Sequence, residues 1–379
     1  MSPSEAVQSS VRFLALERDF AELAGQYREA QDSVFRSGVV VGGPWVERLE
    51  RSIATLCGRK FGIATTSGTE ALRLALVSAG IGPGWQIVIP ALSYIATAGS
   101  VLATGAVPIV IDVDDHGHLE LAQLETVLSQ VNGPIAVVAV GLFGDGLRDD
   151  ALTSLCTARG ALLIEDAAQS FGARHQVRAG GGLGLAASLS FAPTKTLPCF
   201  GNAGMVVTDE PDIATRARLI RAHGKANNQS GSVIVGVNGT LSASHAAQLC
   251  VSLEHYERRA QMRESIADKL IAALRDLTQF TPPPQREHCK HNWHKFVVQS
   301  NHRDALMLFL RERGIECQVH YPIPLCDEPI LEERAFSACV RARTFSRSVL
   351  SLPMHPFLTD AEIDWIAQSM RMFHEKFHA

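Results

Sequence analysis

The feature that most constrains the fold is a series of short apolar segments between residues 61 and 208. Each segment is a continuous apolar run, and stretches with helical apolar spacing separate several of them. Strands of this kind are buried on both faces, which requires a mostly parallel sheet with helices on both sides. The sequence therefore predicts an α/β architecture with strands at 61–65, 86–89, 107–111, 135–140, 161–164, 187–191 and 205–208, and helices at 69–79, 95–104, 119–128 and 147–159.

The sequence changes in character after residue 238. The stretch 242–277 is rich in Ala, Glu and Arg and predicts one long helix, and the prolines at 282–284 form a stiff connector behind it. Beyond them we expect an α+β arrangement, with strands at 295–299 and 316–319 and helices at 303–313 and from residue 359.

Chain length indicates two domains. The chain has 379 residues, and hydrophobic cores stop growing below that size. We expect a large domain over residues 1–255, which includes an N-terminal helical segment, and a small C-terminal α+β domain over residues 256–379.

Composition excludes several classes of partner. The net charge of −4 shows no basic excess, so we expect neither nucleic acid nor an anionic membrane surface as a partner. No apolar stretch is long enough to span a bilayer, and residues 1–12 lack the form of a signal peptide. We therefore expect a cytoplasmic protein. The eight cysteines form no C-x-x-C pair, which is typical of reduced, mostly buried thiols.

Two clusters invite a metal interpretation. One contains His288, Cys289, His291 and His294, and the other covers residues 114–118. The first leads into a predicted strand, where this spacing does not place all its members on one face. The second follows a strand and has the polarity of an exposed turn. We predict no metal site.

Lys195 and Asp166 are the strongest catalytic candidates. Lys195 precedes a Gly-rich turn at 201–204, and Asp166 ends the apolar run at 161–164. A lysine can form a Schiff base with the aldehyde of pyridoxal 5′-phosphate (PLP), and a carboxylate can keep the pyridine nitrogen of that cofactor protonated. Either residue alone also has an ordinary interpretation, as a surface lysine or as a helix cap. The pair suggests a PLP site without establishing it.

A wider pattern resolves this ambiguity. Eight motifs stand in the order found in the DegT/DnrJ/EryC1/StrS family of sugar aminotransferases, and the sequence resembles that family from about residue 12 to residue 356. The motifs lie at residues 67–72, 81–84, 90–97, 165–173, 190–195, 221–224, 236–238 and 319–325. The resemblance implies a fold type I PLP-dependent transferase, whose large domain contains a mostly parallel seven-stranded sheet.

The resemblance also assigns roles to individual residues. It implies that Lys195 carries PLP and that Asp166 faces the ring nitrogen. The cofactor phosphate would lie on Gly68, Thr69 and the hydroxyl of Ser190, where a helix start also offers an anion site. The remaining implied contacts are stacking on the ring by Tyr94, a hydrogen bond to its phenolic oxygen from Gln169, and substrate contacts from His320 and Tyr321.

A last implied contact crosses between subunits. Asn238 matches an asparagine that reaches the cofactor phosphate of the neighbouring subunit, so the resemblance implies a homodimer with shared active sites. Thr240 departs from the pattern, because many relatives carry Arg at this position. Glu70 also departs from it, because the family often has a small residue there. A carboxylate so near a phosphate must point away from it.

The implied activity is transfer of an amino group, with L-glutamate as donor, to a nucleotide-linked keto-sugar. The motifs at 191–197 and 319–325 favour a 3-keto over a 4-keto substrate. A transaminase acting on a cyclitol ketone is an alternative, and so is a PLP-binding sensor without turnover. The related PLP-dependent sugar dehydratases have histidine in place of the lysine, so Lys195 argues against that activity.

Overall fold

The computed structural model describes residues 10–147, 150–226, 231–284 and 286–378. Its central feature is a seven-stranded sheet in the order β1-β9-β8-β5-β4-β2-β3. All seven predicted strands are confirmed, with small shifts at their ends. Their bounds are β1 (Phe61–Thr65), β2 (Gln86–Pro90), β3 (Val107–Ile111), β4 (Ile135–Val140), β5 (Leu162–Asp166), β8 (Ala186–Ser190) and β9 (Gly204–Thr208).

The sheet is mostly parallel, as predicted. Strands β3, β2, β4, β5 and β8 run in one direction, and β9 is antiparallel to both of its neighbours, β8 and β1. The chain reaches β9 from β8 through the turn that follows Lys195, so β9 returns directly beside the strand that it follows. Because β5 and β8 are adjacent and parallel, their carboxyl ends lie side by side at one edge of the sheet.

Successive residues of a strand pack into different cores, which confirms that both faces of the sheet are covered. In β2, Ile87 and Ile89 join one hydrophobic cluster and Val88 joins another. In β9, Val206 belongs to the first cluster, whereas Met205 and Val207 pack on the opposite face. The alternation follows from the two-residue period of a strand.

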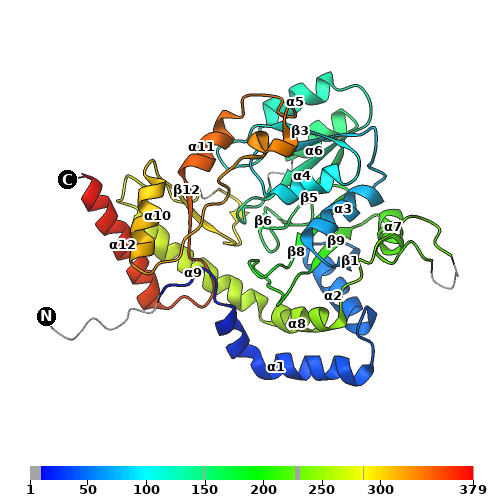
Figure 1. The fold of residues 1–379 in the computed structure, drawn as a ribbon, viewed down its shortest axis with the longest axis horizontal. Coiled ribbons are helices and arrows are strands. Elements are labelled where there is room, and N and C mark those ends of the chain that lie inside the picture. The colour runs from blue at the N-terminus through cyan, green and yellow to red at the C-terminus, as the bar shows by residue number, and fades with distance from the viewer. Residues whose placement is uncertain (1–9, 148–149, 227–230, 285, 379) are drawn as a thin grey trace.

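Seven of the described helices cover these faces (Figure 1). Helices α3, α4 and α7 cover the face that carries the first cluster. On the opposite face, α2 and α8 pack near β1, and α5 and α6 pack near β3. Residues 148–149 of the predicted helix 147–159 lie outside the described residues. The bounds are α2 (Gly43–Leu56), α3 (Gly68–Ser78), α4 (Ile95–Leu102), α5 (Leu121–Gln130), α6 (Asp150–Ala158), α7 (Pro211–Arg221) and α8 (Ala243–Glu254).

The C-terminal region has a separate core beside the large sheet. Strands β11 and β12 pair antiparallel, and helices α9, α10 and α12 pack around them, with Val11 from the start of the described chain among the buried residues. A small sheet pairs β10 with β6, and β6 in turn with β7. The bounds are β6 (Arg174–His175), β7 (Arg178–Ala179), α9 (Tyr256–Leu274), β10 (Cys289–Lys290), β11 (Phe296–Gln299), α10 (Arg303–Glu312), η1 (Leu325–Asp327), η2 (Pro329–Leu331), α11 (Val340–Ser348), β12 (Val349–Leu352) and α12 (Asp360–His378).

Two predictions for this part of the chain were wrong. The stretch 242–277 forms two helices, because His255 leaves helical geometry (φ −102°, ψ 1°) between α8 and α9. The predicted strand 316–319 is not a strand, because the segment makes only single bridges, from Ile315 to Val11 and from Gln318 to Ser351. The residues that pair with β11 come instead from β12. The domain boundary after residue 255 stays a prediction.

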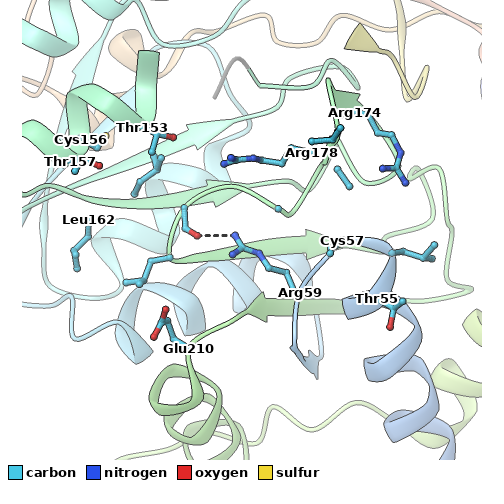
Figure 2. A pocket seen from close by; sticks show the side chains of 18 of the residues that line it. Thr55, Cys57, Arg59, Thr153, Cys156, Thr157, Leu162, Arg174, Arg178 and Glu210 are labelled. Atoms are coloured by element: carbon cyan, nitrogen blue, oxygen red, sulfur yellow. Dashed lines mark hydrogen bonds between the residues drawn. The ribbon is translucent and has the colours of Figure 1, made fainter. Parts of the chain in front are cut away.

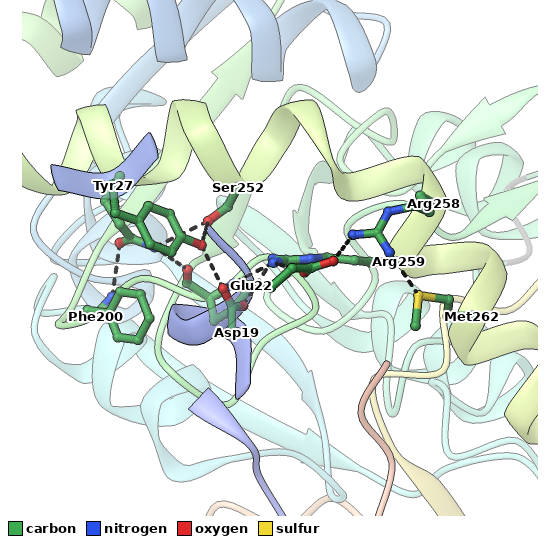
Figure 3. A network of polar contacts seen from close by, with 10 residues as sticks. Asp19, Glu22, Tyr27, Phe200, Ser252, Arg258, Arg259 and Met262 are labelled. Atoms are coloured by element: carbon green, nitrogen blue, oxygen red, sulfur yellow. Dashed lines mark hydrogen bonds and ion pairs between the residues drawn. The ribbon is translucent and has the colours of Figure 1, made fainter. Parts of the chain in front are cut away.

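A buried polar network fixes helix α1 (Leu16–Ser37) against α8 and α9 (Figure 3). The Asp19 carboxylate accepts hydrogen bonds from both terminal nitrogens of Arg259, at 3.0 and 3.1 Å, and from the Tyr27 hydroxyl at 2.6 Å. Ser252 continues the network, since its hydroxyl lies 2.9 Å from that of Tyr27 and 3.3 Å from the side-chain nitrogen of Gln248. Gln248 in turn donates to the carbonyl oxygen of Pro198. The N-terminal helix is thus tied to the segment that follows Lys195.

The eight cysteines are present as thiols, and most are buried. Within the described ranges, no helix combines the length and the apolar character needed to cross a bilayer.

Candidate active site

The predicted site residues meet in a cavity of about 410 Å³ at the carboxyl edge of the sheet. This is the edge at which α/β sheets bind their ligands. The cavity is lined by Gly68, Thr69, Tyr94, Asp166, Gln169, Ser190, Lys195, His320 and Tyr321, which are all the predicted site residues except Asn238.

Lys195 follows β8 on a short turn, in which its backbone N–H donates to the carbonyl oxygen of Ala192 at 2.9 Å. Burial lowers the pKa of Lys195 to about 8, and the negative charge of Asp166 opposes that shift. A lysine with this pKa exists partly as the free amine near neutral pH, which is the form that attacks an aldehyde.

Asp166 ends β5 and is buried. Its Oδ2 accepts a hydrogen bond from the Thr97 hydroxyl at 2.9 Å, and its Oδ1 accepts from the Ala168 N–H at 3.2 Å and the Ser188 hydroxyl at 3.4 Å. Burial raises the pKa of Asp166, and these donors and the charge of Lys195 oppose the rise. A cation placed against this carboxylate would therefore be strongly favoured, since burial strengthens the attraction between opposite charges.

The start of α3 forms the opposite end of the cavity. Ser67 caps the helix by accepting the Glu70 N–H at 3.1 Å. Residue 68 must be glycine, because a Cβ there would lie 2.5 Å from the Ser190 Cβ. The Glu70 carboxylate pairs with Arg73 at 2.6 Å and is absent from the cavity lining. The carboxylate is thus directed away from the anion site, as predicted.

Aromatic and amide side chains complete the wall. The Tyr94 and Tyr321 rings are 5.8 Å apart, and Gln169 Nε2 donates to the Tyr321 hydroxyl at 2.9 Å. Gln169 Oε1 accepts the Phe143 N–H at 2.9 Å, so the amide is oriented from both ends. The His320 Nδ1 lies 2.8 Å from the Ser351 hydroxyl. These contacts fix the orientation of the side chains. Their roles in binding the cofactor and the substrate stay predictions.

Asn238 is an exposed residue outside this lining. Its backbone bridges to Ala222, and the neighbouring Thr240 bridges to Thr65 at the end of β1. Its predicted contact belongs to the active site of a second subunit, so it stays a prediction.

Further lining residues were not predicted as site residues: Thr97, Asn202, His294 and Lys295. Thr97 stands within the motif at 90–97, and its proximity to Asp166 is visible only in the fold. His294 was considered only as a metal ligand, and it contacts the cavity instead. In the described part of the chain, no group of three His, Cys, Asp or Glu side chains is arranged to hold a metal ion.

A second cavity, of about 740 Å³, lies near the amino-terminal ends of β5 and β8 (Figure 2). Arg59 lies on its wall and donates to the carbonyl oxygens of Leu183 and Gly184, each at 2.8 Å, and to the Asp209 carboxylate at 2.9 Å. Arg174 and Arg178 also line it. None of the predicted site residues does, so this cavity is separate from the one around Lys195.

The residues around Lys195 fit PLP. The α3 amino terminus and the Ser190 hydroxyl offer donors for a phosphate, and the absence of a side chain at Gly68 lets Ser190 lie against the start of this helix. Asp166 offers a buried carboxylate to a protonated ring nitrogen, and Lys195 offers the amine for the aldehyde. Bound there, PLP supplies an electron sink.

Comparison with known proteins identifies the family of this chain. Residues 22–371 match the DegT/DnrJ/EryC1/StrS aminotransferase family. A pleiotropic regulatory protein from Geobacillus stearothermophilus is 32% identical over 97% of this chain and 100% of its own length. The dTDP-3-amino-3,4,6-trideoxy-alpha-D-glucose transaminase of Streptomyces venezuelae is 34% identical over 98% of each chain. The UDP-2-acetamido-2-deoxy-3-oxo-D-glucuronate aminotransferase of Pseudomonas aeruginosa is 31% identical over 95% of this chain and 99% of its own.

A solved structure shows the same fold throughout. The crystal structure of S. venezuelae DesV in complex with a ketimine intermediate superposes with a TM-score of 0.93, at 33% identity, over 97% of this chain and 99% of that one. The comparison therefore covers nearly the whole chain, including most of the C-terminal region. The chain belongs to the DegT/DnrJ/EryC1/StrS aminotransferase family, and it is a PLP-dependent aminotransferase.

Proposed function

We propose that this enzyme transfers an amino group from L-glutamate to the 3-keto group of a nucleotide-linked sugar. The observation that carries the proposal is the cavity in which Lys195 and the buried Asp166 lie together beside the start of α3. The names of two relatives support the substrate, because both place the amino or oxo group at carbon 3 of a nucleotide sugar.

In this proposal the chain's own residues perform three tasks. The start of α3 and Ser190 hold the cofactor by its phosphate, and Tyr94 covers its ring. Asp166 stabilises positive charge on the ring nitrogen, because a buried carboxylate favours a nearby cation. Lys195 moves a proton between cofactor and substrate as a general base and acid, and its pKa of about 8 suits it to both directions near neutral pH.

The proposal includes a cytoplasmic homodimer, in which Asn238 of each subunit contacts the phosphate in the active site of the other. Its support is the exposed position of Asn238 outside its own subunit's cavity. His320 and Tyr321 line the cavity and are proposed to contact the sugar.

The test begins with the purified, PLP-loaded enzyme. Addition of L-glutamate should abolish the yellow absorbance of the bound cofactor, since the amino group passes to it. A panel of nucleotide-linked 3-keto and 4-keto sugars, together with an inosose as a cyclitol ketone, is then added, and aminated products are identified by mass spectrometry.

Each outcome has a defined meaning. Amination of 3-keto sugars supports the proposal. Amination of only 4-keto sugars, or of only the inosose, would show that the proposed 3-keto substrate is wrong and that the aminated compound represents the substrate class. A cofactor spectrum that no amino acid changes would contradict transamination and favour a sensor.

A further inference from the structure

Lys295 is a buried cation in the wall of the active-site cavity. It precedes β11 and is 5% exposed. Its ammonium lies 4.6 Å from the centroid of the Phe13 ring. Among the residues that the structure describes, no carboxylate forms an ion pair with it. The cation therefore contacts an aromatic ring on one side and the cavity on another.

The charges around Lys295 are positive. Burial, followed by the charges of Lys195 and Arg263, lowers the pKa of Lys295 to about 7. Lys295 also borders a small cavity that contains Asp145, but that carboxylate is already paired with Arg286 at 2.6 Å. Asp166 is the carboxylate that lines the active-site cavity, and its charge acts on Lys195. The cavity wall at Lys295 thus has an excess of positive charge.

The position of Lys295 is fixed by the backbone around it. Asn292 Nδ2 donates to the carbonyl oxygens of Gln169 and Phe171, at 2.7 and 2.8 Å, and its Oδ1 accepts the His294 N–H at 2.7 Å. The Lys295 N–H donates to the Phe143 carbonyl oxygen at 3.0 Å. The segment that carries Lys295 is therefore attached to the loop that carries Gln169.

His294 adds a second polar group without a partner. Its ring is buried, and neither ring nitrogen has a hydrogen-bond partner in the described part of the protein. Burial, followed by the charges of Lys195 and Lys295, lowers the pKa of His294, so the ring is neutral. A neutral imidazole has one donor and one acceptor to offer. Lys295 and His294 together form a polar surface that an anionic, hydroxyl-bearing ligand would complement.

Stability does not explain a lysine at this position. Burial of a charge without an opposite charge is unfavourable, and an apolar side chain of similar size would avoid that cost. Residues that are retained at a cost to stability are typical of functional sites.

We propose that Lys295 binds a carboxylate of a substrate, which either the amino-acid donor or the sugar carries. The inference rests on the proposed function, because it places a substrate in this cavity. L-Glutamate supplies carboxylates in the first half of the reaction. In the second half, a uronic acid such as the substrate named for the P. aeruginosa relative carries a carboxylate at carbon 6.

The first experiment measures binding by calorimetry. The probe is glutarate, a dicarboxylate that cannot donate an amino group, and the protein is the PLP-loaded enzyme. Lys295→Met should weaken glutarate binding about 10- to 100-fold, because a charge-assisted contact is lost. Lys295→Arg should retain most of the affinity. Lys290→Met is the matched control, since that lysine is 41% exposed and pairs loosely with Glu257 at 3.7 Å. Lys290→Met should leave the affinity for glutarate unchanged.

The second experiment identifies the source of the carboxylate. The L-glutamate concentration that half-abolishes the yellow absorbance should rise in Lys295→Met if the donor is bound. The amination of UDP-2-acetamido-2-deoxy-3-oxo-D-glucuronate is then compared with that of its counterpart with a hydroxymethyl group at carbon 6. A selective loss with the uronate identifies the sugar as the source.

The proposal is overturned if Lys295→Met leaves glutarate, L-glutamate and uronate binding unchanged. It is also overturned if the variant loses affinity for PLP itself, because Lys295 would then serve the cofactor. The thermal unfolding temperature of Lys295→Met should equal or exceed that of the unsubstituted enzyme. This measurement distinguishes a misfolded variant from one that is folded and has lost binding. If the unsubstituted enzyme aminates no sugar, the proposed function fails, and the glutarate measurement still decides the role of Lys295.

Discussion

The hydroxyl of Thr97 donates a hydrogen bond of 2.9 Å to Asp166, the buried carboxylate of the cofactor site. It comes from α4 and belongs to a short relay, because the Ser93 hydroxyl lies 2.7 Å from the Thr97 oxygen. This donor favours the charged form of Asp166 against the effect of burial. Thr97 is therefore a positioning residue for the carboxylate.

Thr97→Val should lower the transamination rate about 10- to 100-fold. The substitution keeps the shape of the side chain and removes a hydrogen bond to a charged group, which contributes about 1.5–3 kcal/mol. The measurement is the rate of cofactor absorbance change after addition of L-glutamate, recorded as a function of pH. Thr97→Ser, which keeps the hydroxyl, should restore most of the rate. Equal rates in the valine and serine variants would show that the hydroxyl has no role.

Asp166→Asn should slow the same reaction by several orders of magnitude while the protein stays folded. A neutral amide does not hold a proton on the ring nitrogen, so the cofactor withdraws electrons less effectively. Circular dichroism and bound PLP content serve as controls. A loss of only about threefold would mean that Asp166 acts as a structural cap and not as the partner of the ring nitrogen.

Lys195→Ala should bind PLP without covalent attachment and should lose turnover. The phosphate and ring contacts do not involve Lys195, whereas the amine that attacks the aldehyde is gone. Borohydride reduction followed by mass spectrometry of the intact protein measures attachment, and Lys290→Ala, which keeps the cavity intact, is the control. Near-normal transamination by Lys195→Ala would disprove the assignment of the catalytic lysine.

Asn238→Ala should weaken PLP binding about tenfold to a hundredfold and leave the dimer intact. The lost donor to a phosphate contributes about 1.5–3 kcal/mol, which is small beside a dimer interface of ordinary size. Equilibrium dialysis measures the affinity, and sedimentation velocity measures assembly. A monomer that binds PLP with full affinity would rule out the shared site, and so would an unchanged dissociation constant in the variant.

Glu362 should make stability depend on acid pH. Its carboxylate accepts two hydrogen bonds from Arg18, at 2.6 and 2.8 Å, and one from the Thr359 N–H at 2.8 Å. These contacts, led by the Arg18 hydrogen bond, lower the pKa of Glu362 from 4.5 to about 2. The contribution is complete above pH 4.5 and is lost as the pH falls through about 2, because the carboxylate is protonated in both the folded and the unfolded state below that pH.

The test compares free energies of unfolding in urea at pH 7 and pH 3. Glu362→Gln should be less stable by about 1–3 kcal/mol at pH 7, and the difference from the unsubstituted enzyme should shrink at pH 3. Asp360→Asn is the control, because Asp360 forms an exposed ion pair with Lys269 and such pairs contribute little. A difference that is the same at both pH values would contradict the assignment.

The sheet could be predicted from sequence because its strands are continuous apolar runs, and burial on both faces leaves few alternatives. Asp166 and Ser190 could be placed together because strands β5 and β8 end at the same edge. The break at His255 was missed, because helical propensity on both sides gives no local signal. The residues 316–319 have strand-like character, but β12 occupies the position beside β11.

Lys295 shows what sequence alone could not supply. In the sequence it is one lysine among many, and lysines are mostly exposed. Its burial depends on Asn292, which reaches the carbonyl oxygen of Gln169 across 123 residues of chain. No periodicity or motif records a contact over that separation. Thr97 was missed for the same reason, because its partner Asp166 lies 69 residues away.

The attachment of the chain's start to its C-terminal region has a consequence for synthesis on the ribosome. Val11 bridges to Ile315, and Arg18 pairs with Glu362. A nascent chain emerges from its amino end, so these early residues have no native partner until nearly the whole polypeptide has been translated. The α/β sheet, whose strands lie between residues 61 and 208, can assemble long before then. Completion of the fold therefore waits for translation of the last helix.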